Sequence, residues 1–110
     1  MIMTYEELVK KVSDTAGKAD AGKIPGHVAF QFNIEGEAAG AFYLEISDGK
    51  VSVQPYEYYD RDVLVTCTAE TLLKIMDGKL DPIMAFTTKK IRVEGDLGKA
   101  VLLKEVVKKK

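Results

Sequence analysis

Two early segments of the chain alternate apolar and polar residues in the way typical of strands that bury one face. In residues 28–34 and 42–46, every second residue is valine, phenylalanine, leucine or isoleucine. A turn near Gly36 separates these segments, and Asp48-Gly49, a strong hairpin signal, leads into a third strand at 51–53. The pattern therefore predicts a meander of three strands, with polar residues such as Gln31 facing solvent.

The second half of the chain combines short helices with two further predicted strands. Residues 63–67 and 91–93 show the same two-residue alternation. After the fourth strand, Thr68 can cap a helix that contains 72–76, and Gly78 stands where a helix end favours glycine. Asp81 and Pro82 have the residue types of an N-cap and a first helical position, so a second short helix is expected to begin there.

A helix is also predicted near each end of the chain. Thr4 and Glu7 have the spacing of a capping box, and apolar residues follow at helical spacing, which predicts a helix over 5–15. Near the C-terminus, Asp96 is expected to cap one last helix with a wide apolar arc. The arc comprises Leu97, Ala100, Val101, Leu102, Leu103, Val106 and Val107. The simplest packing is a single twisted sheet, solvated on one face and covered by helices on the other.

Length and charge narrow the class of protein. With 110 residues, the chain is expected to form one domain over 1–110. Its formal net charge of −1 gives no bulk basic field for nucleic acid. No apolar run approaches the ~20 residues that span a bilayer, and the start lacks a signal-peptide pattern. The single cysteine suits a reducing compartment, and the terminal lysines are not a peroxisomal signal.

No residues in the sequence have the spacing of a catalytic site. His27 is the only histidine and has no acid, serine or cysteine beside it at motif spacing, so it is interpreted as a polar residue that opens the first strand. Cys67 lacks a base and is interpreted as a small buried hydrophobic residue. One histidine and one cysteine cannot supply a metal site. The sequence therefore predicts no enzymatic activity, no metal and no cofactor.

Two other runs have a structural interpretation. Residues 95–100 are too short for a phosphate loop and are interpreted as a strand-to-helix turn. Three tyrosines near acidic residues are expected to cover a sheet edge: Tyr56, Tyr58 and Tyr59. What remains is an apolar excess in the helices, which is either ordinary core or the wall of a ligand slot. The break of 69–88 into two short helices rich in methionine and phenylalanine favours the slot.

The run from Asp62 to Leu103 resembles the sterol carrier protein type 2 domain. That family shows a Gly-Lys-Leu-Asn/Asp-Pro turn, a Met-Ala-Phe helix and a strand ending in Gly-Asp, and this chain has them at 78–82, 84–86 and 95–96. The first half is similar to the family's opening hairpins at 30–32, 42–44 and 48–50. The chain departs from the family at Lys89, where the family often has glycine.

The resemblance implies an α+β fold with a five-stranded, mostly antiparallel sheet, helices covering one face and a hydrophobic tunnel between the layers. It implies a non-enzymatic carrier of a fatty acid, fatty acyl-CoA or sterol-like lipid. Because the peroxisomal tail of the family's eukaryotic members is missing, it also implies a cytoplasmic protein. The alternative is an accessory module that presents a lipid to a partner enzyme or scaffolds it. Strand alternation and helical spacing, together with the resemblance, predict a lining of Phe32, Phe42, Leu44, Leu72, Ile75, Met76, Ile83, Met84, Phe86, Leu102 and Val106.

The last helix is predicted to be a mobile gate that touches anionic membranes. Its apolar arc is wide enough to close a slot or to contact a bilayer surface. Its basic residues are Lys99, Lys104, Lys108, Lys109 and Lys110. The alternative is a solvated helix end with a fraying lysine tail.

Overall fold

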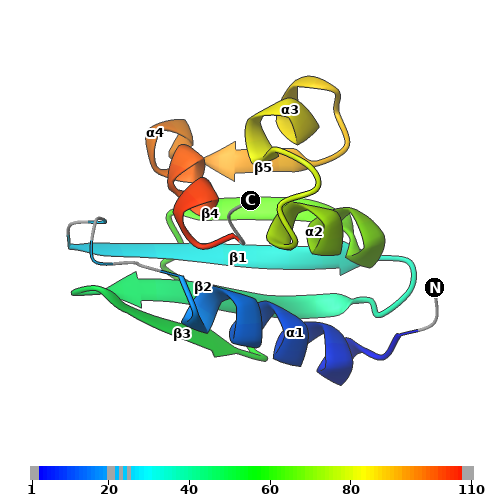
Figure 1. Cartoon of the computed structure of the whole chain (residues 1–110), viewed down its shortest axis with the longest axis horizontal. Coiled ribbons are helices and arrows are strands. Elements are labelled where there is room, and N and C mark those ends of the chain that lie inside the picture. Colours follow the sequence, from blue (N-terminus) through cyan, green and yellow to red (C-terminus); the bar gives the residue numbers. More distant parts are fainter. Residues whose placement is uncertain (1–2, 20–21, 23, 25, 108–110) are drawn as a thin grey trace.

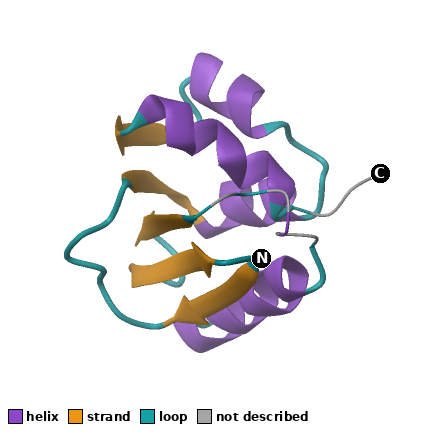
Figure 2. Ribbon diagram, turned by 90° about the vertical axis from the view of Figure 1, so that its left-hand side faces the viewer, coloured by secondary structure: helices purple, strands orange, loops and turns teal. Residues whose placement is uncertain are grey.

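The strands in the described part of the chain form one mixed sheet in the order β3-β2-β1-β4-β5 (Figure 1). The computed structural model describes residues 3–19, 22, 24 and 26–107. In chain order the elements are α1 (Tyr5–Gly17), β1 (His27–Glu35), β2 (Gly40–Ser47), β3 (Lys50–Gln54), β4 (Val63–Thr68), α2 (Ala69–Met76), α3 (Pro82–Thr87), β5 (Arg92–Gly95), α4 (Leu97–Ala100) and the 3₁₀ helix η2 (Val101–Glu105). Figure 2 shows the helices on one side of the sheet, which confirms the predicted α+β architecture.

The central strand β1 pairs in both directions. It runs antiparallel to β2, with Phe32 opposite Phe42, and parallel to β4, with Phe32 opposite Val65. The pairings of β2 with β3 and of β4 with β5 are antiparallel. The predicted mostly antiparallel sheet is confirmed, and the parallel β1–β4 pair makes it mixed. A parallel pair needs a crossover, so the chain after β3 returns across the sheet instead of forming another hairpin.

The helices α1 and α2 close the core over the middle of the sheet. Thr4 and Glu7 form the predicted capping box, with Thr4 Oγ1 accepting from Glu7 N at 3.1 Å and Glu7 Oε1 accepting from Thr4 N at 3.0 Å. The rings of Phe32 and Phe42 stack with centroids 5.2 Å apart. Side chains of this core that are fully buried include Leu8, Val12, Phe30, Phe32, Phe42, Leu44, Ile46, Leu72 and Ile75.

The opposite face of the sheet is partly covered, which corrects the expectation that it is solvated throughout. Gln31 is 2% exposed, because the loop between β3 and β4 lies over it. Its Oε1 accepts from Tyr58 N at 3.1 Å, and its Nε2 donates to Asn33 Oδ1 at 2.9 Å. The Tyr58 ring meets the Tyr43 ring edge-on at 4.9 Å, so this tyrosine covers the face of the sheet and not its edge. A buried amide is tolerated here because its polar atoms are hydrogen-bonded.

The last helix is shorter than expected. Asp96 caps it as predicted, with Oδ1 accepting from Lys99 N at 3.1 Å, but the α-helix ends at Ala100 and continues as the 3₁₀ helix η2. Gly98 weakens the α-helical turn. In η2 the buried residue is Leu103, and the buried Val106 follows as its C-cap. The apolar arc predicted for one α-helix is therefore divided between α4, η2 and the residues after it.

The helices α2 and α3 end in the same hydrogen-bond pattern. In α2, Gly78 N donates to Ile75 O at 3.1 Å and Lys79 N donates to Lys74 O at 2.9 Å. In α3, Lys89 N donates to Phe86 O and Lys90 N donates to Ala85 O, at 3.1 and 2.8 Å. Both are Schellman ends, whose pivotal residue adopts a left-handed conformation. That residue is Gly78 (φ 76°) in α2 and Lys89 (φ 63°) in α3, so Lys89 is strained where the family often has glycine.

Candidate functional site

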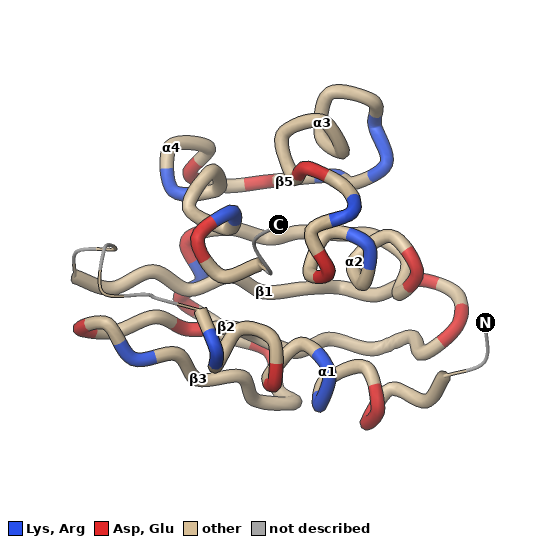
Figure 3. The backbone as a smooth tube through the Cα atoms, viewed as in Figure 1, with Lys and Arg blue, Asp and Glu red and all other residues tan. Residues whose placement is uncertain are grey.

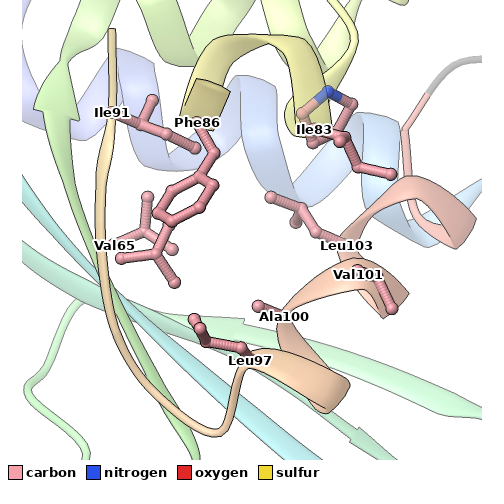
Figure 4. A pocket seen from close by; sticks show the side chains of 10 residues that line it. Val65, Ile83, Phe86, Ile91, Leu97, Ala100, Val101 and Leu103 are labelled. Carbon is pink, nitrogen blue, oxygen red and sulfur yellow. The ribbon is translucent and has the colours of Figure 1, made fainter. Parts of the chain in front are cut away.

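An apolar cavity of about 140 Å³ lies between α3, the α4–η2 segment and the β4–β5 end of the sheet (Figure 4). Its lining consists of aliphatic and aromatic side chains and one proline. These residues are Val65, Pro82, Ile83, Phe86, Ile91, Val93, Leu97, Ala100, Val101 and Leu103. The cavity lies at one end of the sheet, and a tunnel running between the layers stays a prediction.

The cavity has a buried floor and an exposed mouth. Val65 in β4, Ile91 before β5 and Leu103 in η2 are buried and form the floor. Around them stand side chains that are about half exposed: Ile83 at 49% and Phe86 at 44% from α3, and Leu97 at 54% and Val101 at 42% from the α4–η2 segment. Figure 4 shows these four residues around the opening. An apolar group could therefore enter from solvent between the two helical segments.

The position of α3 follows from its two ends. Asp81 Oδ1 accepts from Ile83 N at 2.7 Å and from Met84 N at 3.3 Å, and Pro82 occupies the first turn. This N-cap starts a new helix where α2 would otherwise continue, as predicted. Ala85 is the one buried residue of α3. Burial of apolar side chains therefore contributes less to holding α3 than to holding α2, in which five residues are buried.

The position of α4 depends on Asp62, which joins three segments. Its Oδ2 accepts from Ala29 N at 2.8 Å, its Oδ1 accepts from Lys99 Nζ at 3.1 Å, and its carbonyl oxygen accepts from Asp96 N at 2.9 Å. Burial raises the pKa of the Asp62 carboxyl, but the hydrogen bonds from Ala29 and Lys99 outweigh it and the pKa is lowered. The ionised carboxylate therefore ties α4 to the sheet.

The polar residues that could do chemistry lie away from the cavity or are inert. Cys67 is buried, as predicted, and burial raises the pKa of its thiol to about 12, so it is not a thiolate near neutral pH. His27 opens β1, as predicted, with its Nε2 2.6 Å from Glu45 Oε2. Tyr58 also donates to Glu45, and the hydrogen bonds from His27 and Tyr58 lower the pKa of that carboxyl. Strand alternation places His27 and Glu45 on the face of the sheet opposite the cavity, and Tyr58, in the loop between β3 and β4, contacts them there.

Over the described part of the chain, no group of three or more histidine, cysteine, aspartate or glutamate side chains could hold a metal. Among the described residues, no helix is long enough and apolar enough to cross a membrane.

The structure distributes the eleven predicted lining residues over several places. Ile83 and Phe86 line the cavity. Met84 is exposed and Leu102 is half-buried, and neither lines the cavity. The others are buried in the core and are not among the lining residues: Phe32, Phe42, Leu44, Leu72, Ile75, Met76 and Val106. Contact of these residues with a lipid stays a prediction.

Sequence reasoning missed eight of the lining residues. They are Val65, Pro82, Ile91, Val93, Leu97, Ala100, Val101 and Leu103. Four of them belong to the apolar arc predicted for the last helix, whereas the predicted lining contains Leu102 and Val106 of the same arc. Which side of the arc faces the sheet depends on the rotational phase of the helix, and the change to a 3₁₀ helix alters that phase. The alternation at 91–93 was also a usable signal, since it marks the strand that forms one wall.

The comparisons with known proteins agree with the fold. The profile of the SCP-2 sterol transfer family matches residues 5–108. Hydroxysteroid dehydrogenase-like protein 2 from Xenopus tropicalis is 29% identical over 105 residues, which cover 94% of this chain and 24% of that protein. Sterol carrier protein 2 from Bos taurus is 30% identical over 105 residues, which cover 94% of this chain and 19% of that protein. The chain thus spans a quarter or less of the length of these two relatives.

A solved structure of a related protein has the same fold. The solution structure of palmitated SCP2L2 from Aedes aegypti is similar with a TM-score of 0.68 and 26% identity, and the match covers 94% of each chain. The domain shared by these proteins is a lipid-binding and lipid-transfer fold that also occurs as a module of larger proteins. Since the family profile matches almost the whole sequence, the chain belongs to the SCP-2 sterol transfer family.

Proposed function

We propose that this domain carries a fatty acid, a fatty acyl-CoA or a sterol-like lipid, with the apolar part of the ligand in the cavity between α3 and the α4–η2 segment. The cavity carries the proposal, because its lining is apolar and its mouth is open to solvent. The relative described as palmitated shares the fold, which supports an acyl chain as ligand. The domain holds the lipid without acting on it chemically.

A long acyl chain requires the cavity to widen. At about 140 Å³ the cavity is close to the ~150 Å³ that admits a benzene-sized molecule, whereas pockets for larger ligands measure roughly 300 Å³ or more. The sequence placed the gate on the last helix, but Lys99 and Asp62 tie α4 to the sheet at 3.1 Å. The helix α3, with Ala85 as its one buried residue, is the better candidate for the moving element.

The expected affinity is moderate. Burying one methylene contributes about 0.8 kcal/mol, so ten methylenes contribute roughly 8 kcal/mol before the cost of ordering the ligand and opening the cavity. A dissociation constant near micromolar corresponds to about 8 kcal/mol, so binding in the micromolar range or weaker is expected. Such binding suits a carrier, which has to release its ligand.

Filling the cavity tests the proposal directly. Ala100 lines the cavity, and Ala100→Leu adds three carbons to it. The variant should bind a fluorescent fatty acid at least 10-fold more weakly while keeping its thermal unfolding midpoint. Ala39→Leu, at an exposed residue between β1 and β2, is the matched control and should bind normally. Equal binding of the fatty acid by both variants would contradict the cavity as its binding site.

A second candidate is an accessory module that presents its lipid to a partner enzyme. The observation in its favour is that relatives matching 94% of this chain are four to five times longer, so the domain also occurs within larger proteins. Mass spectrometry of protein purified without detergent would detect a bound lipid under either candidate. Transfer of a fluorescent fatty acid between vesicles by the isolated chain would favour the carrier, and no transfer despite binding would favour the module.

A further inference from the structure

Exposed apolar side chains gather around the mouth of the cavity. Among the described residues, seven large apolar or tyrosine side chains are strongly exposed, and five of them lie on α3 and the α4–η2 segment. The five, called here the apolar rim, are Ile83, Met84, Phe86, Leu97 and Val101. The other two are Tyr56 and Tyr59, whose hydroxyl groups can form hydrogen bonds with water. Single exposed apolar residues are ordinary, but a cluster of this kind marks an interaction surface.

The same part of the chain is basic. Residues 78–110 contain nine lysine or arginine and four aspartate or glutamate residues, a formal net charge of +5. Residues 1–77 contain seven basic and thirteen acidic residues, a net charge of −6. The near-neutral total therefore hides two stretches of the sequence with opposite net charge. Lys108–Lys110, which contribute three of the positive charges, lie outside the described residues, and Figure 3 shows basic residues interspersed with acidic ones around α3 and α4.

Three lysines flank α3 directly. Lys79 stands two residues before its N-cap, Asp81, while Lys89 and Lys90 follow its C-terminal end. All three are exposed, and within the described part of the chain none forms an ion pair. Their ammonium groups are therefore available to an external anionic partner at the border of the apolar rim.

We propose that the apolar rim docks on an anionic bilayer surface, with its side chains among the lipid tails and the flanking lysines at the headgroups. Apolar side chains bordered by basic ones fit such an interface. A second copy of the chain fits less well, because self-association through this face would bring two basic regions together. The sequence placed membrane contact on the last helix and on Lys108–Lys110, which lie outside the described residues. The proposed contact keeps Leu97 and Val101 of that helix and adds α3 at the mouth of the cavity.

The consequence of this docking rests on the proposed function: a lipid could pass between bilayer and cavity without crossing water. Docking itself does not need an occupied cavity. The two ideas can therefore fail separately, and the experiment keeps them apart by measuring vesicle binding and fatty-acid binding on the same variants.

A single tryptophan reports whether the rim enters a bilayer. The chain has no tryptophan, so Met84→Trp and Tyr59→Trp each introduce the only one. Met84 is exposed and does not line the cavity, and Tyr59 is exposed on the loop before β4. With vesicles of phosphatidylserine and phosphatidylcholine at low salt, the tryptophan at 84 should shift to the blue and be quenched by brominated lipid. The tryptophan at 59 should show neither change.

Charge reversal tests the lysines. Lys79→Glu with Lys90→Glu should lower partition onto the same vesicles at least 10-fold. Lys11→Glu with Lys50→Glu makes the same change in net charge at exposed positions of the acidic region and should change partition less than 2-fold. Equal losses in both pairs, or no shift at position 84, would overturn the docking surface. So would a dimer in solution that the change at position 84 dissociates.

The fatty-acid titration is made without vesicles. The lysine variants should bind fatty acid as the parent does, and Ala100→Leu should bind vesicles as the parent does. Loss of vesicle binding in Ala100→Leu would contradict an independent docking surface. Circular dichroism shows whether each variant folds. If a tryptophan variant does not fold, the charge-reversal test decides, and if a charge-reversal variant does not fold, the tryptophan test decides.

Discussion

The two ends of the helical layer are built differently. Over β1 and β2, the helices α1 and α2 close a core in which Leu8, Phe32 and Phe42 are fully buried. At the β4–β5 end, α3 and the α4–η2 segment surround a cavity. Five of the eight residues of α2 are buried, against one of the six residues of α3. Two short helices of similar capping therefore differ chiefly in what lies beneath them.

This difference separates stability from binding. Burial of apolar area is the main stabilising contribution to folding, and the closed end supplies most of it. The open end contributes less, so it can rearrange around a ligand without unfolding the sheet. The domain thus keeps a rigid half and a half that is suited to opening.

The largest expected difference between the two ends is the loss of stability when a phenylalanine ring is removed. Phe32→Ala leaves a void in the closed core and should lower the free energy of unfolding by about 3–5 kcal/mol. Phe86→Ala, at a ring that is 44% exposed, should cost about 1 kcal/mol and should weaken fatty-acid binding. Urea unfolding of both variants measures this, and similar losses would mean that the cavity end is as well packed as the core.

Hydrogen exchange should show the next largest effect. The amides of Ala85 in α3 and of its C-cap Thr88 should exchange at least 100-fold faster than those of Phe30 and Phe32 in the central strand β1. An excess of fatty acid should slow exchange in α3 and leave β1 unchanged. Mass spectrometry of peptides after exchange resolves the two segments, and equal protection would contradict an opening at α3.

The two Schellman ends allow a smaller, paired test. Gly78→Ala places a side chain at φ 76° and should lower stability by about 1 kcal/mol. Lys89→Gly relieves the same conformation at the end of α3 and should raise stability by up to about 1 kcal/mol. Lys90→Gly, at the next position, is the control and should not stabilise. Thermal unfolding midpoints of the three variants decide whether Lys89 is strained.

The smallest expected effect is the change in the stability contribution of Asp62 at acidic pH. The pKa of Asp62 is lowered in the folded state, so the carboxylate contributes stability above its unfolded pKa of about 4, and the contribution is lost as pH falls through the lower folded value. Asp62→Asn should therefore be less stable than the parent at pH 7, and the difference should shrink by pH 3. Asp60→Asn, at an exposed residue of the same loop, should match the parent. Urea unfolding at the two pH values measures both.

Local chemistry determined most of the elements. The capping box at Thr4 and Glu7 started α1, and Asp81 with Pro82 separated α3 from α2, because short side chains bind the first free amides of a helix. The turn at Asp48-Gly49 formed where predicted, with φ of 50° and 80° at the two residues. These features depend on residues close in the sequence, so the sequence by itself was sufficient to predict them. It was also sufficient to place the five strands on one helix-covered sheet.

Tertiary structure decided which residues meet. Alternation at β1 and β4 marks the buried face of each strand but does not show that they pair in parallel, and this pairing places Val65 at the floor of the cavity. Likewise, Gln31 has the pattern of a solvated residue, yet the β3–β4 loop covers it and supplies its hydrogen bonds. In the last segment, the structure buries Leu103 and Val106 and leaves Val101 exposed, a division of the apolar arc that the local sequence does not predict. Each of these depends on contacts between distant segments, whose energies outweigh the weak local preferences of the chain.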